Sequence, residues 1–209
     1  MRNPLSVLGY TAAIWAAAIM LASPAAAQTT TGYKFLEAVR KQDGTKVEEM
    51  LSNIGSKGTP GSVIINSRDI TSGDTALHIV IAKRDINWLT YFIAKGADVN
   101  VRNAKGTTPL WLAVNSAFID GAQLLITKGA RINDPGPSGE TPLIAAVHLK
   151  NLELVKSLIA AGADLNRADS SGRTPLDYAQ LNGKGSMIVT ELENAAKTAK
   201  ARKAKTYGP

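Results

Sequence analysis

A short motif that begins with threonine recurs along this chain at a constant spacing. Three of its four copies read Thr-Pro-Leu, and the threonines are Thr75, Thr108, Thr141 and Thr174. A second motif, Gly-Ala-x-x-Asn, keeps the same spacing from Gly96 to Gly129 to Gly162. Two motifs that share one period of about 33 residues indicate a stack of structural repeats. Such a stack buries its core between neighbouring units and exposes a long outer surface, which favours binding over catalysis.

The residue types of both motifs suit a pair of helices in each unit. Threonine is a good N-cap, and proline fits the first helical position, where its missing N–H costs nothing. One unit therefore predicts a first helix over residues 142–149 and a second over residues 152–160, the latter with apolar residues at helical spacing. The glycine of the second motif then ends the second helix, because it tolerates a left-handed backbone.

This combination, Gly-x-Thr-Pro-Leu followed by Gly-Ala-Asp-x-Asn, resembles the ankyrin repeat, and the resemblance covers residues 35 to about 193. It implies an all-α solenoid of about five units with short β-hairpin-like turns. The first and last units depart from the pattern and act as caps, and Glu191 stands where the inner units carry Phe92, Leu125 and Leu158. The expected units are residues 33–66, 67–100, 101–133, 134–166 and 167–196.

Residues 1–27 have the layout of a cleavable secretory signal peptide. Arg2 precedes a mostly apolar segment over residues 5–21, and an Ala-x-Ala cleavage site ends at Ala27. The alternative is an uncleaved membrane anchor, although the apolar segment is short for a span of about 20 residues. The layout predicts export, and the resemblance to exported bacterial proteins of this kind predicts a periplasmic location.

The net charge of +7 is concentrated at the C-terminal end of the chain. The basic tail, residues 197–209, holds five lysines and arginines and no acidic residue, so the rest of the chain is close to neutral. A basic nucleic-acid-binding surface is therefore not expected. We expect the tail to be the frayed end of the last helix followed by a disordered, solubilising end. The alternative is a weak attraction to an anionic membrane surface or to an acidic partner.

The resemblance implies that a partner protein contacts the tips of the turns and the concave side of the first helices. The corresponding positions carry mostly small polar side chains of mixed charge, as protein-facing surfaces do. The candidate partner-binding residues are Thr71, Ser72, Asp74, Lys83, Lys105, Thr107, Asn115, Ser116, Ser138, Glu140, His148, Arg173 and Asn182. The alternative is that most of them are solvated turn residues, and we expect only a handful to carry binding energy.

The regular spacing fails once, between Leu51 and Thr75, where about nine extra residues enter the chain. They lie within residues 52–66, whose glycines and Pro60 predict a loop, while residues 63–65 read as a strand-like or buried segment. Insertions in solenoids gather on one edge, often the binding face. A tolerated surface loop is an equally weighted alternative, because lengthening a loop costs little.

The sequence does not support catalysis, and no cofactor or metal is expected. The chain has no cysteine and two histidines, His78 and His148, which occupy different positions in units two repeats apart. No metal-ligand pair or nucleophile–base arrangement follows from them. His78 follows Thr-Ala-Leu, where the family places a structural hydrogen-bonding histidine. Trp111 takes that position one unit later and is expected to be a packed aromatic side chain.

These observations together predict a monomeric, non-enzymatic protein that binds another protein and is exported to the bacterial envelope. The partner protein is not specified by any residue. The alternative function is that of an inhibitor or immunity-type protein that blocks a toxin or an enzyme. A tight one-to-one complex in which the target loses activity would favour that alternative.

Overall fold

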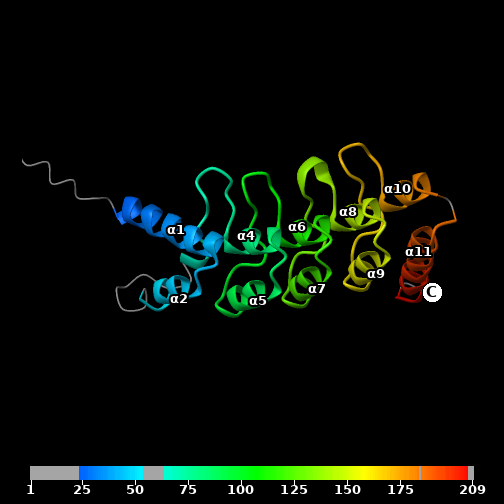
Figure 1. Ribbon diagram of the computed structural model, residues 1–209. Coiled ribbons are helices and arrows are strands. Elements are labelled where there is room, and N and C mark those ends of the chain that lie inside the picture. The colour runs from blue at the N-terminus through cyan, green and yellow to red at the C-terminus, as the bar shows by residue number, and fades with distance from the viewer. Residues whose placement is uncertain (1–23, 54–63, 184, 207–209) are drawn as a thin grey trace, which may run out of the picture.

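The computed structural model describes residues 24–53, 64–183 and 185–206, and they form a single row of helix pairs (Figure 1). Within these residues ten α-helices and one 3-10 turn have both ends described, residues 64–65 are helical as well, and no strand occurs, which confirms the all-α solenoid. The five pairs are α1 (Pro24–Lys41) with α2 (Gly44–Asn53), α4 (Ala76–Ala82) with α5 (Ile86–Ala94), α6 (Pro109–Asn115) with α7 (Ile119–Thr127), α8 (Pro142–His148) with α9 (Leu152–Ala160), and α10 (Pro175–Leu181) with α11 (Met187–Thr206).

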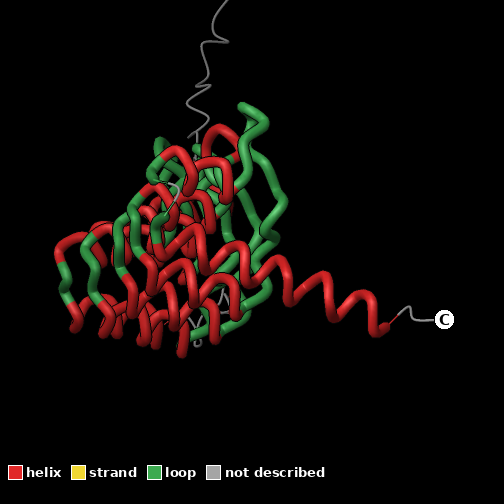
Figure 2. The backbone as a smooth tube through the Cα atoms, turned by 90° about the vertical axis from the view of Figure 1, so that its right-hand side faces the viewer, coloured by secondary structure: helices red, strands yellow, loops and turns green. Residues whose placement is uncertain are grey.

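The helices lie in two layers. The first helix of each pair packs against the first helix of the next, and the second helices α5, α7, α9 and α11 do the same. The core runs between these layers along the whole row, and its largest fully buried side chains include Phe35, Phe92, Leu125 and Leu158. The long turns between pairs project on the side away from the second helices (Figure 1). We call them the finger loops and number each by the unit whose first helix follows it, from the second to the fifth. Figure 2 shows the row nearly end-on.

The repeated threonines begin the first helices as their residue type predicts. Thr108, Thr141 and Thr174 each adopt an extended backbone, and each hydroxyl oxygen accepts a hydrogen bond from the backbone N–H three residues later. Proline occupies the first helical position in all three helices. The caps therefore set the phase of the repeat and fix where each finger loop ends.

The asparagine of the second motif joins each unit to the next. Asn100 Oδ1 accepts a hydrogen bond from the backbone N–H of Arg131 at 2.8 Å, and Asn133 Oδ1 accepts one from that of Asp164 at 2.8 Å. Asn66 makes the same contact with the N–H of Asp98. These bonds link turns about 31 residues apart in sequence. The asparagines are thus structural members of the stack.

In the three inner pairs, a residue other than glycine adopts a left-handed backbone at the turn between the two helices. Arg84, Ala117 and Lys150 have φ of 55°, 51° and 53°, and each follows the end of a first helix. The second helices end in the same way but use glycine, with Gly96 at φ 90°. An L-residue with a side chain in this conformation costs about 1–2 kcal/mol, a cost that glycine avoids.

Replacing Ala117 or Lys150 with glycine should therefore stabilise the protein. We expect the free energy of unfolding to rise by about 0.5–1 kcal/mol for each change. The reason is that the relief of backbone strain outweighs the entropic cost of ordering a more flexible glycine. Urea unfolding followed by circular dichroism measures the effect. Gly96→Ala is the matched control and should lose about 1 kcal/mol, since its Cβ would meet no atom within 4 Å and only strain remains. A loss of stability in both glycine variants would contradict the explanation.

The first pair departs from the others on both sides of α2. Helix α1 begins at Pro24, so the expected cleavage position after Ala27 falls in its first turn, and most of the expected leader lies outside the described residues. The expected loop of the insertion, residues 54–63, also lies outside them. Ile64 and Ile65 are buried, as the sequence predicts, but they are helical and not strand-like.

The last pair bears on two sequence-based expectations. Leu192 is buried and Glu191 only half-buried, so Leu192 and not Glu191 occupies the place of Leu158. The reason is the longer connection before α11, which moves the buried face of that helix along by one residue. Helix α11 also continues to Thr206, so most of the basic tail belongs to the last helix. Alanine and lysine are strong helix formers, and no glycine or proline interrupts them before Gly208.

Candidate protein-binding surface

The finger loops are held in shape by one acidic or amide side chain in each of three units. Asp69 Oδ1 accepts from the backbone N–H groups of Thr71 and Ser72, Asn103 Oδ1 from those of Lys105 and Thr107, and Asp169 Oδ1 from those of Ser171 and Arg173. Two backbone hydrogen bonds close each of these loops, as from the Asp69 N–H to the Asp74 carbonyl at 2.9 Å and from the Gly73 N–H to the Asp69 carbonyl at 2.9 Å. The tips are therefore preorganised, which lowers the entropic cost of binding.

These contacts lower the pKa of Asp69. The backbone N–H of Ser72 and then the guanidinium of Arg40, which forms an ion pair with this carboxylate, hold the pKa of Asp69 at about 2. An unfolded aspartate titrates near 3.9. Because the folded pKa is depressed, this carboxylate contributes its full stabilisation above about pH 4 and loses it as the pH falls towards 2.

Backbone hydrogen bonds join the finger loops in two couples. The N–H of Ala104 donates to the Ser72 carbonyl at 2.9 Å, and the N–H of Ser170 donates to the Ser138 carbonyl at 3.0 Å. The residue at the corresponding place in the fourth unit is Pro137, which has no N–H to donate. The Arg102 side chain replaces this backbone link between the third and fourth finger loops. It donates a hydrogen bond to the Pro135 carbonyl at 3.0 Å and forms an ion pair with Asp134 at 3.1 Å.

The fourth finger loop is built around Trp111. This side chain is only 8% exposed, which confirms the packed aromatic residue that the sequence predicts. Gly136 stands where the neighbouring loops carry Asn103 and Asp169, and a Cβ at Gly136 would lie 2.4 Å from indole Cε2. The closing backbone hydrogen bond is kept, from the Gly136 N–H to the Glu140 carbonyl at 2.9 Å, and the 3-10 turn Pro137–Gly139, with Ser138 at φ of 61°, replaces the side-chain contacts. The indole of Trp111 in the third unit therefore leaves no room for a side chain at Gly136 in the fourth.

Gly136→Ala should destabilise the protein by about 1–3 kcal/mol, because the added methyl group overlaps a buried ring that cannot leave its site. Thermal unfolding followed by circular dichroism measures the loss. Combining the change with Trp111→His, the residue type found at His78 one unit earlier, should restore most of it. Gly185→Ala is the control, since its Cβ would have nothing within 4 Å. Equal losses for Gly136 and Gly185 would contradict the overlap.

Tyr178 is the centre of a cluster that joins the fourth and fifth units. The His148 ring meets the Tyr178 ring edge-on, with centroids 4.3 Å apart, and His148 Nδ1 lies 2.7 Å from Glu140 Oε1. The Arg173 guanidinium carbon lies 5.7 Å from the Tyr178 centroid. Three expected partner-binding residues, Glu140, His148 and Arg173, are therefore brought together by a tyrosine that the sequence did not single out.

Hydrogen bonds fix this cluster against the last finger loop. The Tyr178 hydroxyl donates to Asp169 Oδ2 at 2.6 Å, and Tyr178 and then Ser171 hold the pKa of Asp169 well below its usual range. The Thr174 hydroxyl likewise lowers the pKa of Asp177. Both carboxylates are therefore ionised at neutral pH. The cluster thus combines the phenol ring of Tyr178 on α10 with a histidine at the end of α8 and an arginine of the last finger loop.

An open hollow of about 410 Å³ adjoins this cluster. It is lined by Arg173, Asp177, Gln180 and Leu181, all from the last finger loop and α10. Leu181 is 70% exposed and adds apolar surface to the rim of this hollow. Exposed apolar surface rimmed by charged groups is typical of protein-binding sites.

The other expected partner-binding residues are spread along the row. Of all thirteen, eight are exposed: Thr71, Lys83, Lys105, Asn115, Ser138, His148, Arg173 and Asn182. Four are half-buried: Ser72, Asp74, Ser116 and Glu140. Thr107 is buried, and we leave it out of the surface because its backbone atoms bond within the fold.

His78 has a structural role, as expected. It is 1% exposed; its Nδ1 accepts from the backbone N–H of Thr75 at 3.3 Å, and its Nε2 donates to the Thr107 carbonyl at 3.0 Å. The ring therefore ties the cap of α4 to the next finger loop, and desolvation by burial lowers its pKa.

Sequence reasoning missed Ile70, which stands at the tip of the second finger loop. Its side chain is 82% exposed, and the loop holds one residue more than the third, since Asp69 precedes Thr75 by six positions and Asn103 precedes Thr108 by five. Comparing these two intervals would have revealed the extra residue. Ile70 adds an apolar contact at the far end of the finger row.

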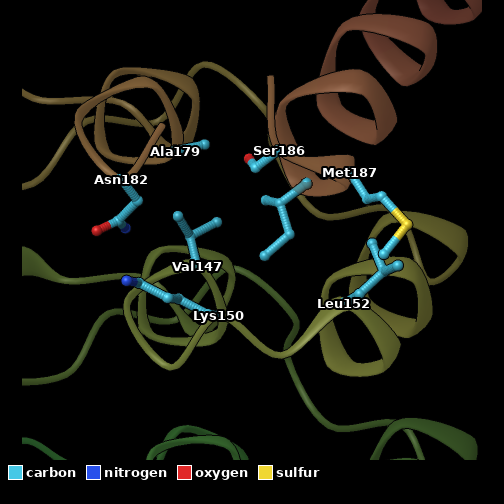
Figure 3. Close-up of a pocket in the computed structure, with 8 residues that line it drawn as sticks. Val147, Lys150, Leu152, Ala179, Asn182, Ser186 and Met187 are labelled. Atoms are coloured by element: carbon cyan, nitrogen blue, oxygen red, sulfur yellow. The ribbon is translucent and has the colours of Figure 1, made fainter. Parts of the chain in front are cut away.

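A second, smaller hollow of about 190 Å³ lies under the last pair (Figure 3). Val147, Leu152, Ala179 and Ile188 form apolar walls, and Lys150, Asn182, Ser186 and Met187 complete the lining. In Figure 3, Lys150 extends beneath Asn182, and Met187 lies beside Leu152. Gln180, which is exposed, stands where the preceding unit has buried Val147, so the inner side of α10 fills less space there.

The described residues offer little for metal or membrane chemistry. No group of three or more histidine, cysteine, aspartate or glutamate side chains among them is placed to hold a metal ion. No helix in the same part of the chain is both long and apolar enough to span a bilayer.

A row of paired helices with rigid, hydrogen-bonded finger loops defines a helical repeat protein of the binding class. Comparison with family models gives its family: residues 35–136 match a model of ankyrin repeats in three copies, and residues 125–179 match one of ankyrin repeats in many copies. The two matches together span residues 35–179, and the chain belongs to the ankyrin-repeat family. Ankyrin repeats are protein–protein interaction modules. No curated protein matches the chain in sequence.

Proposed function

We propose that this protein is a non-enzymatic binding module, exported to the bacterial envelope, that binds one partner protein through its finger loops. The contact centres on the surface around Tyr178, made by Glu140, His148, Arg173 and Leu181. Ile70 forms a second, separate apolar contact at the other end of the finger row. The protein acts as a monomer in the periplasm.

The observation that carries this proposal is the convergence on Tyr178. Binding energy in protein interfaces concentrates in a few residues, with tyrosine and arginine enriched among them. Here a tyrosine contacts both His148 and Arg173, a hollow adjoins it, and Leu181 is largely exposed. The Asp169 side chain fixes both the loop and the tyrosine hydroxyl.

The proposed export rests on the sequence of residues 1–27 alone. A basic start, an apolar segment and an Ala-x-Ala site in that order are the parts of a secretory signal peptide. Fractionation of cells that express the tagged protein, with N-terminal sequencing of the product, tests the expectation. A chain that begins at Gln28 in the periplasmic fraction supports it, and an intact N-terminus in the membrane fraction supports the anchor.

Affinity capture from the native envelope fraction tests the binding surface. Residues 28–209 serve as bait, and captured proteins are quantified by mass spectrometry against two bait variants, Arg173→Glu and Leu181→Asp. Lys156→Glu and Thr127→Asp are the matched controls, because they make the same kinds of charge change at exposed positions of the second helices. A partner retained by both controls and lost from both variants supports the surface. A partner that all four variants retain rejects it.

The same captured partner distinguishes the inhibitor alternative. Its activity is measured with and without an equimolar amount of the binding module. Loss of activity in a tight one-to-one complex assigns the inhibitor role, and retained or increased activity assigns the role of a supporting partner.

A further inference from the structure

The C-terminal half of α11 leaves the stack. Leu192 is the last buried side chain of the helix and Ala195 the last half-buried one, whereas residues 196–201 are exposed. The backbone remains helical to Thr206. In Figure 2 this part of the helix projects away from the body of the protein. We call residues 196–206 the C-terminal arm.

The arm carries a concentrated positive charge. Lys197 and Lys200 lie on its exposed part, and Arg202, Lys203 and Lys205 follow in its sequence, with no acidic residue after Glu193. The stack itself is close to neutral, since the chain without Arg2 and these five residues has 18 basic and 17 acidic residues. Most of the net charge of the protein therefore sits on one projecting helix.

The residues between these cations are small. From Ala195 to Thr206 the arm contains only alanine and threonine besides lysine and arginine. Protein interfaces depend on a few large anchors such as tryptophan, tyrosine or leucine, and the arm has none. It also lacks the bulky apolar face that would insert into a bilayer. What it offers is charge, which is sufficient for attraction to an anionic lipid surface.

We propose that the C-terminal arm binds the surface of anionic phospholipid membranes electrostatically and tethers the ankyrin stack there. The arm begins in the layer of second helices, on the side of the stack away from the finger loops (Figure 1). A stack held in this way keeps its finger loops free. The proposal does not depend on the partner-binding surface, so either can fail without the other.

Vesicle sedimentation tests the proposal. The protein is residues 28–209, which retain every buried core residue and lack the apolar segment 5–21 that would itself enter a bilayer. Vesicles of phosphatidylcholine alone are compared with vesicles in which one lipid in three is phosphatidylglycerol, at low and at high salt. We expect binding to the anionic vesicles only, and its loss at high salt, because screening weakens exposed charges.

Charge-neutralising variants locate the contact. Lys197→Gln, Lys200→Gln and Lys203→Gln combined should weaken binding to anionic vesicles by roughly 100-fold, since each cation near such a surface contributes about fivefold. The matched control neutralises three exposed lysines of the stack, Lys34, Lys128 and Lys156, and should change binding by less than about fivefold. Circular dichroism checks that both triple variants stay folded.

Three results would overturn the proposal. The first is equal binding to neutral and anionic vesicles, and the second is an equal loss in both triple variants. The third is stronger binding of the arm to soluble poly-glutamate than to vesicles at the same concentration of negative charge, which would assign the arm to an acidic protein instead.

Discussion

Replacing Phe92 with alanine should lower the free energy of unfolding by about 3–5 kcal/mol. Phe92 is fully buried on α5 and contacts three other aromatic rings, with centroid distances of 6.1 Å to Phe35, 5.2 Å to Trp88 and 5.5 Å to Tyr91. Removing the ring leaves a cavity between the first and second units that stiff aromatic neighbours cannot fill. Urea unfolding followed by tryptophan fluorescence measures the loss.

The matched variant is Phe92→Leu, because Leu125 and Leu158 occupy the corresponding positions of the next two units. Leucine fits the repeat and fills most of the space, so we expect a cost of about 1 kcal/mol. If alanine and leucine destabilise the protein equally, the aromatic cluster does not contribute as a packed unit and the interpretation fails.

His78→Ala should have the second largest effect, a loss of about 2–3 kcal/mol. The change removes the partner of the Thr75 backbone N–H and of the Thr107 carbonyl, and both groups are buried where water does not replace the ring. His148→Ala is the control, since that histidine is exposed and its loss should cost less than about 1 kcal/mol. Chemical unfolding measures the free energy of unfolding of both variants. Equal losses would contradict the structural role of His78.

His78 also predicts a pH dependence of stability. Its folded pKa is lowered by burial, while the unfolded chain titrates near 6.5. The unfolded state therefore binds the proton first, so stability should fall as the pH drops below about 6.5. Protonation at Nδ1 would also replace the acceptor of the Thr75 backbone N–H with a ring N–H, so that two hydrogen-bond donors would face each other. The decline between pH 7 and pH 5 should shrink in His78→Ala, and an unchanged decline would contradict this origin.

Most of the fold could be predicted from the sequence because its signals are local and repeated. The threonine caps, the proline at the first helical position and the glycine after the second helix each act within a few residues, and they recur at one spacing. His78 and Trp111 could be interpreted in the same way, since each stands at a position whose role the repeat defines.

The site was harder to predict because it depends on contacts between units. Glu140, His148 and Arg173 were expected separately, but Tyr178 brings them together across 38 positions of sequence, from 140 to 178. Thr107 was expected at the surface, yet the bond from His78 and the turn around Asn103 bury it. The longer connection before α11 places Leu192, and not Glu191, at the buried position that corresponds to Leu158. No local sequence pattern predicts this shift of one residue.

The third and fourth finger loops are linked by the side chain of Arg102, whereas the other neighbouring finger loops are linked by backbone hydrogen bonds. Between the second and third loops and between the fourth and fifth, a backbone hydrogen bond couples neighbours whatever the salt concentration. Between the third and fourth, where Pro137 has no N–H, the Arg102 side chain makes the link through a hydrogen bond to the Pro135 carbonyl and an ion pair with Asp134, and dissolved ions screen the ion pair. Rising ionic strength should therefore weaken the contact between the third and fourth finger loops and leave the other two contacts between neighbouring loops unchanged.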